Sequence, residues 1–172
     1  MELASSFIAR PLTTADADAC ALLVNAAEWT PSGRDMLTYC LGSGFSEGAF
    51  TLEGSLVGLL LAIPYHKYRC DMEEQFNSIF SIDGENTPYS KNLHKPLLSL
   101  PDKEIVYIRY IAVSPAHRRL GIESYMVKEL MRRSGMTMAA KLSYGGLRPI
   151  FKSLGFSLTN MGKGRALAIK RN

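Results

Sequence analysis

The sequence has few of the residues that form metal sites or disulfides. In 172 residues there are three cysteines and three histidines. The cysteines, at 20, 40 and 70, include no CxxC pair, and the histidines, at 66, 94 and 117, lie far apart in the sequence. We therefore predict no metal site, and the odd number of widely spaced cysteines indicates a reduced, cytoplasmic protein.

Long hydrophobic runs and a strong excess of one charge are also missing. The N-terminal segment MELASSFIAR has no apolar signal core, and the longest apolar run, at 56–64, is far too short to span a bilayer. Lysine and arginine number 20 against 16 acidic residues, and this net charge of +4 is too small and scattered to indicate nucleic-acid binding. We expect neither a membrane nor a nucleic acid as a partner.

The sequence does contain the pattern of one mixed α/β domain over residues 1–172. Hydrophobic residues make up 47% of the chain, enough for a sizeable core. Apolar periodicity and turn residues predict strands at 6–12, 49–54, 55–65, 104–113, 136–143, 156–160 and 165–171. They predict helices that begin near Asp16 and that cover 34–41, 119–133 and 150–154. The second and third strands should form an antiparallel hairpin, and the last two a second antiparallel pair.

The segment 67–103 separates the third strand from the fourth and is long for a connection. Met72, Phe76, Ile79 and Phe80 fall at helical spacing, which predicts an amphipathic helix over 71–81 that packs against the rest of the domain.

The most informative stretch is 104–131, EIVYIRYIAVSPAHRRLGIESYMVKELM. An apolar, β-branched strand leads into a turn marked by Pro115, then into a short loop with Arg and Gly, then into an amphipathic helix. Backbone N–H groups at a helix N-terminus, with cationic side chains beside them, suit a pyrophosphate. The sequence therefore predicts a phosphate-bearing cofactor at this loop.

Two motifs resemble signatures of the GCN5-related N-acetyltransferase (GNAT) superfamily. Val113-Ser114-Pro115, followed by RRLGIE at 118–123, is similar to its V-x-P turn and its R/Q-x-x-G-x-G/A acetyl-CoA signature. LRPIFKSLGF at 147–156 is similar to its A-x-x-x-Y-x-x-x-G-F pattern. The order of elements also matches over nearly the whole chain. The resemblance implies a GNAT-like acyl-CoA N-acyltransferase fold, a mixed α/β sheet, with a long insertion between the third and fourth strands.

The resemblance also implies acetyl-CoA as cosubstrate. Its pyrophosphate would lie on the N–H groups of 119–124, aided by the helix dipole. Its pantetheine arm would pair with the main chain of 111–113, where family members splay two parallel strands, and a strand N–H there would stabilise the oxyanion. The cofactor-binding residues so implied are Ile111, Ala112, Val113, Arg118, Arg119, Leu120, Gly121, Ile122, Glu123, Ser124 and Phe151.

Three positions depart from the family pattern. Glu123 takes the place of the second Gly or Ala, where it either obstructs the phosphates or points to solvent and stabilises its helix. Arg119 replaces a small residue, as a compensating cation or as a solvated charge. Phe151 stands where many members have a Tyr that protonates the CoA thiolate. Because a thiol has a pKa of about 8.5, this loss should slow turnover without abolishing it.

The catalytic candidates are Glu104, Tyr107 and Tyr144. Tyr144 would either replace the missing proton donor or be an ordinary aromatic residue of the loop. Glu104 is offset from the family's general base, which falls near Tyr107, and would be either that base or an exposed acid at the end of the strand. Tyr107 fits packing or substrate contact better than base chemistry. Side-chain alternation would place Tyr107 and Arg109 on one face of the strand and Tyr110 on the other. A water chain, or an amine that arrives neutral, would remove the need for a base.

The expected function is an acetyl-CoA-dependent N-acetyltransferase that acetylates a primary amine by direct attack in a ternary complex. The insertion at 67–103 would cover the acceptor side, which favours a small-molecule amine, while a protein acceptor stays open, as does the choice between monomer and homodimer. The alternative is a catalytically weak or inactive GNAT fold that serves as an acyl-CoA sensor or a protein-interaction module.

Overall fold

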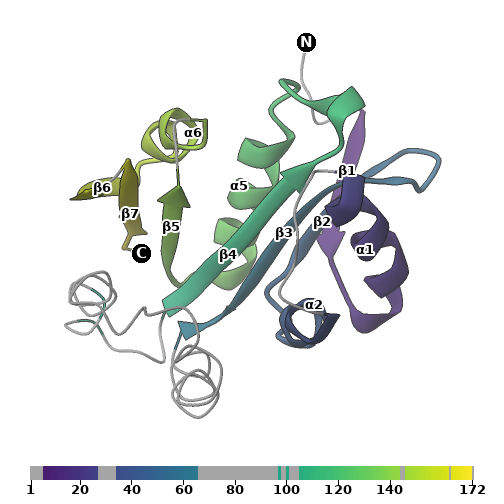
Figure 1. The fold of residues 1–172 in the computed structure, drawn as a ribbon, viewed down its shortest axis with the longest axis horizontal. Coiled ribbons are helices and arrows are strands. Elements are labelled where there is room, and N and C mark those ends of the chain that lie inside the picture. Colours follow the sequence, from purple (N-terminus) through teal and green to yellow (C-terminus); the bar gives the residue numbers. More distant parts are fainter. Residues whose placement is uncertain are drawn as a thin grey trace.

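The structure, a computed structural model, describes residues 6–26, 34–65, 97, 100, 105–143, 146–162 and 164–171. Its strands are β1 (Phe7–Pro11), β2 (Glu47–Thr51), β3 (Leu56–Pro64), β4 (Ile105–Val113), β5 (Thr137–Ser143), β6 (Ser157–Gly162) and β7 (Arg165–Lys170). Its helices are α1 (Ala17–Ala26), α2 (Arg34–Gly42), α5 (Ile122–Ser134) and α6 (Arg148–Ser153), with short 3-10 helices at Thr14–Asp16 and Pro115–His117. The expected mixed α/β fold is confirmed, in the expected order of elements (Figure 1).

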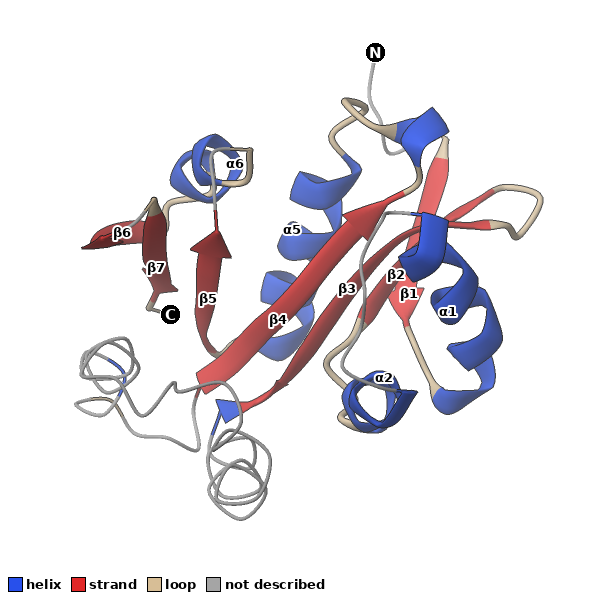
Figure 2. Ribbon diagram, in the orientation of Figure 1, coloured by secondary structure: helices blue, strands red, loops and turns tan. Residues whose placement is uncertain are grey.

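The described strands form one seven-stranded sheet in the order β1-β2-β3-β4-β5-β7-β6. Only β4 and β5 pair in parallel, and every other neighbouring pair is antiparallel (Figure 2). The expected hairpin of β2 and β3 and the expected terminal pair of β6 and β7 are both present. Because β7 inserts between β5 and β6, the last strand of the chain supports the parallel pair from one side.

Helices cover both faces of the sheet, and each face has its own apolar core. On one face, α5 packs through Ile122, Met126 and Leu130, all fully buried. On the other face, α1 and α2 pack through Cys20, Val24 and Leu37.

The first turn of α5 lies very close to the sheet. A Cβ atom at Gly58 of β3 would lie only 2.8 Å from Ile122 Cγ2, so glycine is needed for this approach. The helix begins at Ile122, three residues later than expected. The cause is the backbone before it, since Arg119 (φ 64°) and Gly121 (φ 77°) are left-handed and cannot continue a right-handed helix.

A β-bulge in the central strand corrects one expectation about which side chains share a face. Leu61 of β3 pairs with Tyr110 and Ala62 pairs with Ile108, so Arg109 is an extra residue in β4. The extra residue shifts the alternation of the strand. Tyr110 therefore packs with Tyr107 against the core of the α1 and α2 face, and not on the opposite face as simple alternation predicted.

An ion pair between the partly exposed Arg133 and the buried Glu47 ties the C-terminal end of α5 to β2. Arg133 Nε donates to Glu47 Oε1 at 2.6 Å, and Arg133 Nη1 donates to the Gly44 carbonyl at 2.8 Å. Glu47 is only 1% exposed. Burial raises the pKa of Glu47, and Arg133 opposes that shift. The pair fixes the helix whose N-terminus forms part of the candidate site.

Among the described residues, no helix has both the length and the apolar character needed to cross a membrane. The predicted insertion at 67–103 falls between β3 and β4, but its predicted helix at 71–81 lies outside the described residues.

Candidate active site

The parallel strands β4 and β5 part halfway along their length. Their ladder runs from the pair Ile105 and Thr137 to the pair Ile108 and Ala140 and ends there. Both strands continue, β4 as far as Val113 and β5 as far as Ser143. On its other side, β4 stays paired with β3 as far as Val113. The expected splaying of two parallel strands is therefore present, and it begins directly after Ile108 (Figure 2).

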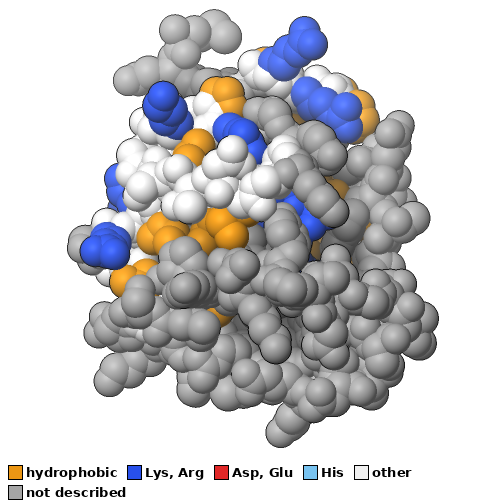
Figure 3. Space-filling view, turned by 60° about the vertical axis from the view of Figure 1, so that its left-hand side comes forward, with side chains coloured by type: hydrophobic (Ala, Val, Ile, Leu, Met, Phe, Trp, Pro, Cys, Tyr) orange, Lys and Arg blue, Asp and Glu red, His pale blue; other side chains and the backbone are white. Residues whose placement is uncertain are grey.

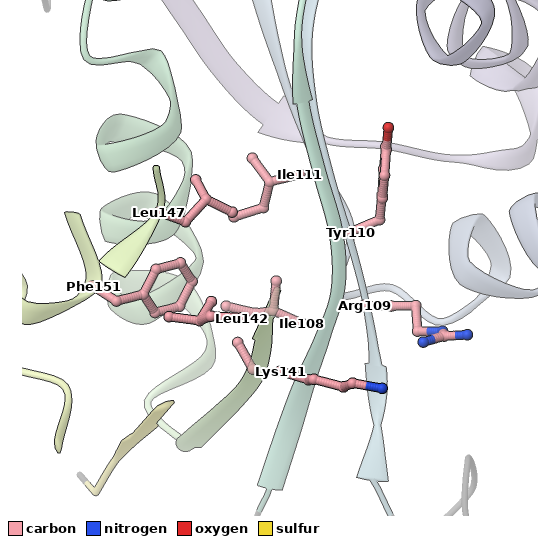
Figure 4. A pocket seen from close by; sticks show the side chains of 9 residues that line it. Ile108, Arg109, Tyr110, Ile111, Lys141, Leu142, Leu147 and Phe151 are labelled. Carbon is pink, nitrogen blue, oxygen red and sulfur yellow. The ribbon is translucent and has the colours of Figure 1, made fainter. Parts of the chain in front are cut away.

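A cleft of about 320 Å³ opens between the parted strands. Its apolar wall, on the side of α5 and α6, consists of Ile108, Ile111, Leu142, Leu147 and Phe151 (Figure 4). The other lining residues are Arg109, Tyr110, Ala140 and Lys141. In Figure 4 the side chains of Arg109, Tyr110 and Lys141 point away from the apolar wall. The cleft thus has an apolar side and a polar side.

The loop between β4 and α5 presents backbone N–H groups at the open end of the parted strands. Arg119 and Gly121 are left-handed, and no side chain caps the N-terminus of α5. The first N–H groups of a helix have no partner within it. An anion can therefore bind here, favoured by the helix dipole and by the exposed side chains of Arg118 and Arg119. Glu123 lies half-buried in the first turn of the helix.

His117 is a structural residue of this loop. Its Nδ1 lies 2.7 Å from Ser114 Oγ, and its ring meets the ring of Phe7 of β1 edge-on, with centroids 6.0 Å apart. The Ser114 N–H donates to the Val57 carbonyl of β3 at 2.8 Å. These contacts fix the turn that leads from β4 to the loop before α5.

Phe151 holds the end of α6 as well as lining the cleft. Gly155 (φ 83°) ends the helix, with the Phe156 N–H bonded to the Phe151 carbonyl and the Gly155 N–H bonded to the Lys152 carbonyl, both at 3.0 Å. This is a Schellman motif, in which the residues at C3 and C″ usually make an apolar contact. Phe151 and Phe156 make that contact here, and Phe151 is fully buried.

The structure places one of the three predicted catalytic residues. Tyr107 is 3% exposed, and its ring centroid lies 6.1 Å from that of Tyr65, within the core of the α1 and α2 face. It does not line the cleft. Glu104 and Tyr144 lie outside the described residues.

The described cysteines are poor nucleophiles. Cys20 and Cys40 are fully buried free thiols, and burial raises the pKa of each to about 12. Within the described ranges no group of His, Cys, Asp or Glu side chains could hold a metal ion. The chemistry of the cleft must therefore be sought in residues other than these thiols.

Sequence reasoning gave no binding role to Arg109, Tyr110, Lys141 or Leu147, which all line the cleft. A signal was available for two of them, because Arg109 and Lys141 each interrupt an otherwise apolar strand. The position of Tyr110 on the polar side of the cleft depends on the β-bulge at Arg109, which the sequence did not indicate. Burial raises the pKa of Tyr110, and the nearby Arg118 cation opposes that shift.

Comparison with known proteins gives matches of structure rather than of sequence. No protein-family model matches the chain, and no curated protein matches it in sequence. Among solved structures, a mosquito arylalkylamine N-acetyltransferase (like 5b) matches with a TM-score of 0.70 and 12% identity, over 97% of this chain and 100% of that one. A polyamine N-acetyltransferase of Drosophila melanogaster, which catalyses the formation of N-acetylagmatine, matches with a TM-score of 0.66 and 13% identity, over 96% and 100% of the two chains.

A third structure contains the coenzyme. Diaminobutyrate acetyltransferase EctA from Paenibacillus lautus, in complex with L-2,4-diaminobutyric acid and coenzyme A, matches with a TM-score of 0.62 and 13% identity, over 95% of this chain and 93% of that one. The shared architecture extends over almost the whole of each chain. The protein thus has the fold of the GCN5-related N-acetyltransferases, as the two sequence motifs indicated.

Proposed function

We propose that the protein is an acetyl-CoA-dependent N-acetyltransferase that acts on the primary amine of a small molecule. One observation carries the proposal: β4 and β5 part after Ile108 and Ala140, and the opening leads toward the uncapped N-terminus of α5. A cosubstrate with a diphosphate at one end and a slender amide arm at the other needs both features.

The residues present fit acetyl-CoA. The loop and first turn at 118–124 would hold the diphosphate through main-chain N–H groups and the cations of Arg118 and Arg119. The main chain of 111–113 would pair with the amides of the pantetheine arm. Arg109 to Val113 spans about 13 Å at the usual rise of a strand, which gives an extended arm a path from the loop to the fork. Phe151 and Leu147 would form the apolar wall beside its thiol end.

The proposed reaction is direct transfer between two bound substrates. The neutral amine nitrogen attacks the thioester carbonyl carbon, a C–N bond forms, and the C–S bond breaks as the thiolate leaves with the electron pair. A main-chain N–H of β4 would stabilise the oxyanion that forms in between. The buried, high-pKa thiols of Cys20 and Cys40 favour this route over a covalent intermediate on either of them.

Among the described lining residues, only Tyr110 and Lys141 carry a proton that could be donated to the leaving thiolate. No carboxylate or imidazole lines the cleft there, and Phe151 cannot donate a proton. A CoA thiolate is a tolerable leaving group near neutral pH. Glu104 as the base and Tyr144 as the acid stay our candidates, with water as the alternative proton acceptor.

The acceptor would enter from the α1 and α2 face. The three structural neighbours described above are named for small amines, namely polyamines, arylalkylamines and diaminobutyrate. Leu97 and Leu100 pack into the core of the α1 and α2 face, so part of the 67–103 segment lies on that side. We propose that this segment covers the acceptor, which suits a small molecule.

The test is calorimetric titration of the purified protein with acetyl-CoA and with CoA, followed by an assay of thiol release with a panel of amines. Micromolar binding and amine-dependent release of CoA would support the proposal. Failure to bind both acetyl-CoA and CoA would overturn the proposed function. Binding without turnover of any amine would favour the alternative, an acyl-CoA sensor, for which the missing proton donor at Phe151 is the supporting observation.

A further inference from the structure

Strand β3 extends beyond the end of its neighbour β2, and two serine hydroxyls bond to it there. The ladder between β2 and β3 ends at the pair of Glu47 and Leu60, while β3 continues. Two residues further on, the Ala62 N–H donates to Ser46 Oγ at 3.2 Å, and the Ala62 carbonyl accepts from Ser43 Oγ at 2.6 Å. The hydroxyls thus take the place of a neighbouring strand at Ala62.

The same hydroxyls join β3 to the last turn of α2. Ser46 Oγ donates to the Cys40 carbonyl at 2.9 Å, and Ser46 is fully buried. Each hydroxyl has one proton, so with Ser43 donating to Ala62, the Cys40 carbonyl and both main-chain groups of Ala62 are bonded at once. The charge of Arg109 also reaches this turn, since burial raises the pKa of the Cys40 thiol and the Arg109 cation opposes that shift. The end of α2 therefore lies close to the bulged part of β4.

Ala62 lies directly across from the bulge of β4. It pairs with Ile108, and the preceding Leu61 pairs with Tyr110, so the extra residue Arg109 falls between these two pairs. Ile108 is also the last residue of β4 that pairs with β5. One pairing therefore links the serine hydroxyls to the bulge and to the fork, the point where β4 and β5 part.

We propose that Ser46, together with Ser43, is a positioning residue for acetyl transfer, because it holds Ala62 and thereby the bulge of β4 at the fork. The proposal rests on the proposed function, in which a main-chain N–H of β4 stabilises the oxyanion. A bulge changes the direction of the groups around it, so its exact position matters beside a reacting centre. A displacement of about 1 Å there can cost about 100-fold in rate.

The competing role of the two serines is purely structural, since buried main-chain groups need partners wherever a strand ends. The two roles predict different measurements. A purely structural bond lowers stability and leaves the kcat of the folded protein unchanged. Loss of positioning lowers kcat and leaves the affinity for acetyl-CoA unchanged, because the loop before α5 would hold the diphosphate.

The test variants are Ser46→Ala and Ser43→Ala, and the matched control is Ser157→Ala. The Ser157 hydroxyl also joins two elements, since it donates to the Ile169 carbonyl at 3.0 Å and links β6 to β7. These strands lie at the left of Figure 1, on the side of the molecule that Figure 3 brings forward, where described Lys and Arg side chains lie beside hydrophobic ones. Ser157→Ala therefore removes the same kind of bond far from the fork.

A second control separates lost stability from lost positioning. Val127→Ala truncates a fully buried side chain of α5 on the opposite face of the sheet. Each variant is assayed for kcat and KM with the best amine of the panel, for the dissociation constant of acetyl-CoA, and for urea unfolding. The main-chain amide resonances of 109–111 are recorded by NMR without ligand, as a readout that does not depend on turnover.

We expect Ser46→Ala to lower kcat at least tenfold, to change acetyl-CoA affinity less than threefold and to shift the resonances of 109–111. Ser43→Ala should lower kcat at least threefold, and it decides the matter if Ser46→Ala does not fold. Ser157→Ala and Val127→Ala should keep kcat within twofold of wild type and leave those resonances in place.

An unchanged kcat in both test variants, or unmoved resonances of 109–111, would overturn the inference, as would an equal loss of kcat in Val127→Ala. Failure of the wild type to bind acetyl-CoA or to acetylate any amine would instead count against the proposed function. The resonances would then still test the link between Ser46 and the bulge.

Discussion

The ring of Phe151 meets the ring of Phe156 edge-on, with centroids 4.7 Å apart, where α6 ends and the chain turns into β6. One residue therefore closes a helix, fills the core and walls the cleft. We expect Phe151→Ala to lower the free energy of unfolding by about 3 to 5 kcal/mol, since the site is fully buried. Urea denaturation measures this, with the exposed neighbour Lys152→Ala as control. A similar, small effect of both substitutions would show that the packing of Phe151 contributes little.

Two left-handed glycines flank α5, and only the first lies at the proposed phosphate site. Substituting each one therefore separates the effect of backbone strain on stability from an effect on acetyl-CoA binding. Gly121 (φ 77°) precedes the helix and Gly135 (φ 58°) follows it. A Cβ at either position costs about 1 to 2 kcal/mol of stability. We expect Gly121→Ala to weaken acetyl-CoA binding at least tenfold and Gly135→Ala to leave it unchanged, as measured by calorimetry. Equal affinities of the two variants would contradict an anion site at the helix N-terminus.

Glu123 offers a test of charge at the same loop. Its carboxylate lies in the first turn of α5, where phosphates would bind. We expect Glu123→Gln, which keeps the shape and removes the charge, to tighten acetyl-CoA binding about threefold to tenfold at low salt, with a smaller gain at 0.5 M salt because ions screen the repulsion. Unchanged affinity at both salt concentrations would show that the side chain points away from the ligand.

The ion pair of Glu47 and Arg133 should control stability in a pH-dependent way. Arg133→Met leaves a buried carboxylate without that partner, and we expect it to lower the free energy of unfolding by about 2 to 3 kcal/mol at pH 7.5. Burial holds the folded-state pKa of Glu47 above its ordinary value, and loss of Arg133 should raise it further. A raised carboxyl pKa favours folding at low pH and loses that contribution as pH rises through it. The deficit of the variant should therefore shrink near pH 4.5.

The matched control for that pair is its neighbour. Arg132 is exposed and bonds Glu129 within the same helix, so Arg132→Met should leave stability nearly unchanged. Thermal or urea unfolding at the two pH values compares both variants. If the loss of unfolding free energy in Arg133→Met grew as the pH fell, the buried carboxyl of Glu47 could not be its cause.

The pH dependence of turnover tests the lack of a base among the described lining residues. If the amine loses its proton to water, kcat/KM should rise tenfold per pH unit up to the pKa of the amine itself. A plateau well below that pKa would reveal a base in the protein. Loss of the plateau in Glu104→Gln would then identify Glu104 as that base.

The order of elements was predictable because each element buries its own apolar stripe, as Ile122, Met126 and Leu130 do along α5. Features that depend on distant partners were not predictable. The bulge at Arg109 follows from the register with Leu61 and Ala62 of β3, and the burial of Glu47 follows from an arginine 86 positions away. The start of α5 was placed too early because the left-handed backbone of Arg119 has no signal in the sequence.

The parting of β4 and β5 has a consequence for the behaviour of the chain in a crowded solution. A sheet border invites other strands to add to it, and proteins usually protect such borders. Between Arg109 and Val113, β4 has such a border inside the molecule, flanked by β3 on one side and by the wall of Leu147 and Phe151 on the other. In the proposed function, the extended arm of the cosubstrate would pair with this internal border as an added strand would. On that proposal, the same main-chain groups that would make an outer border prone to strand addition would serve to bind one ligand.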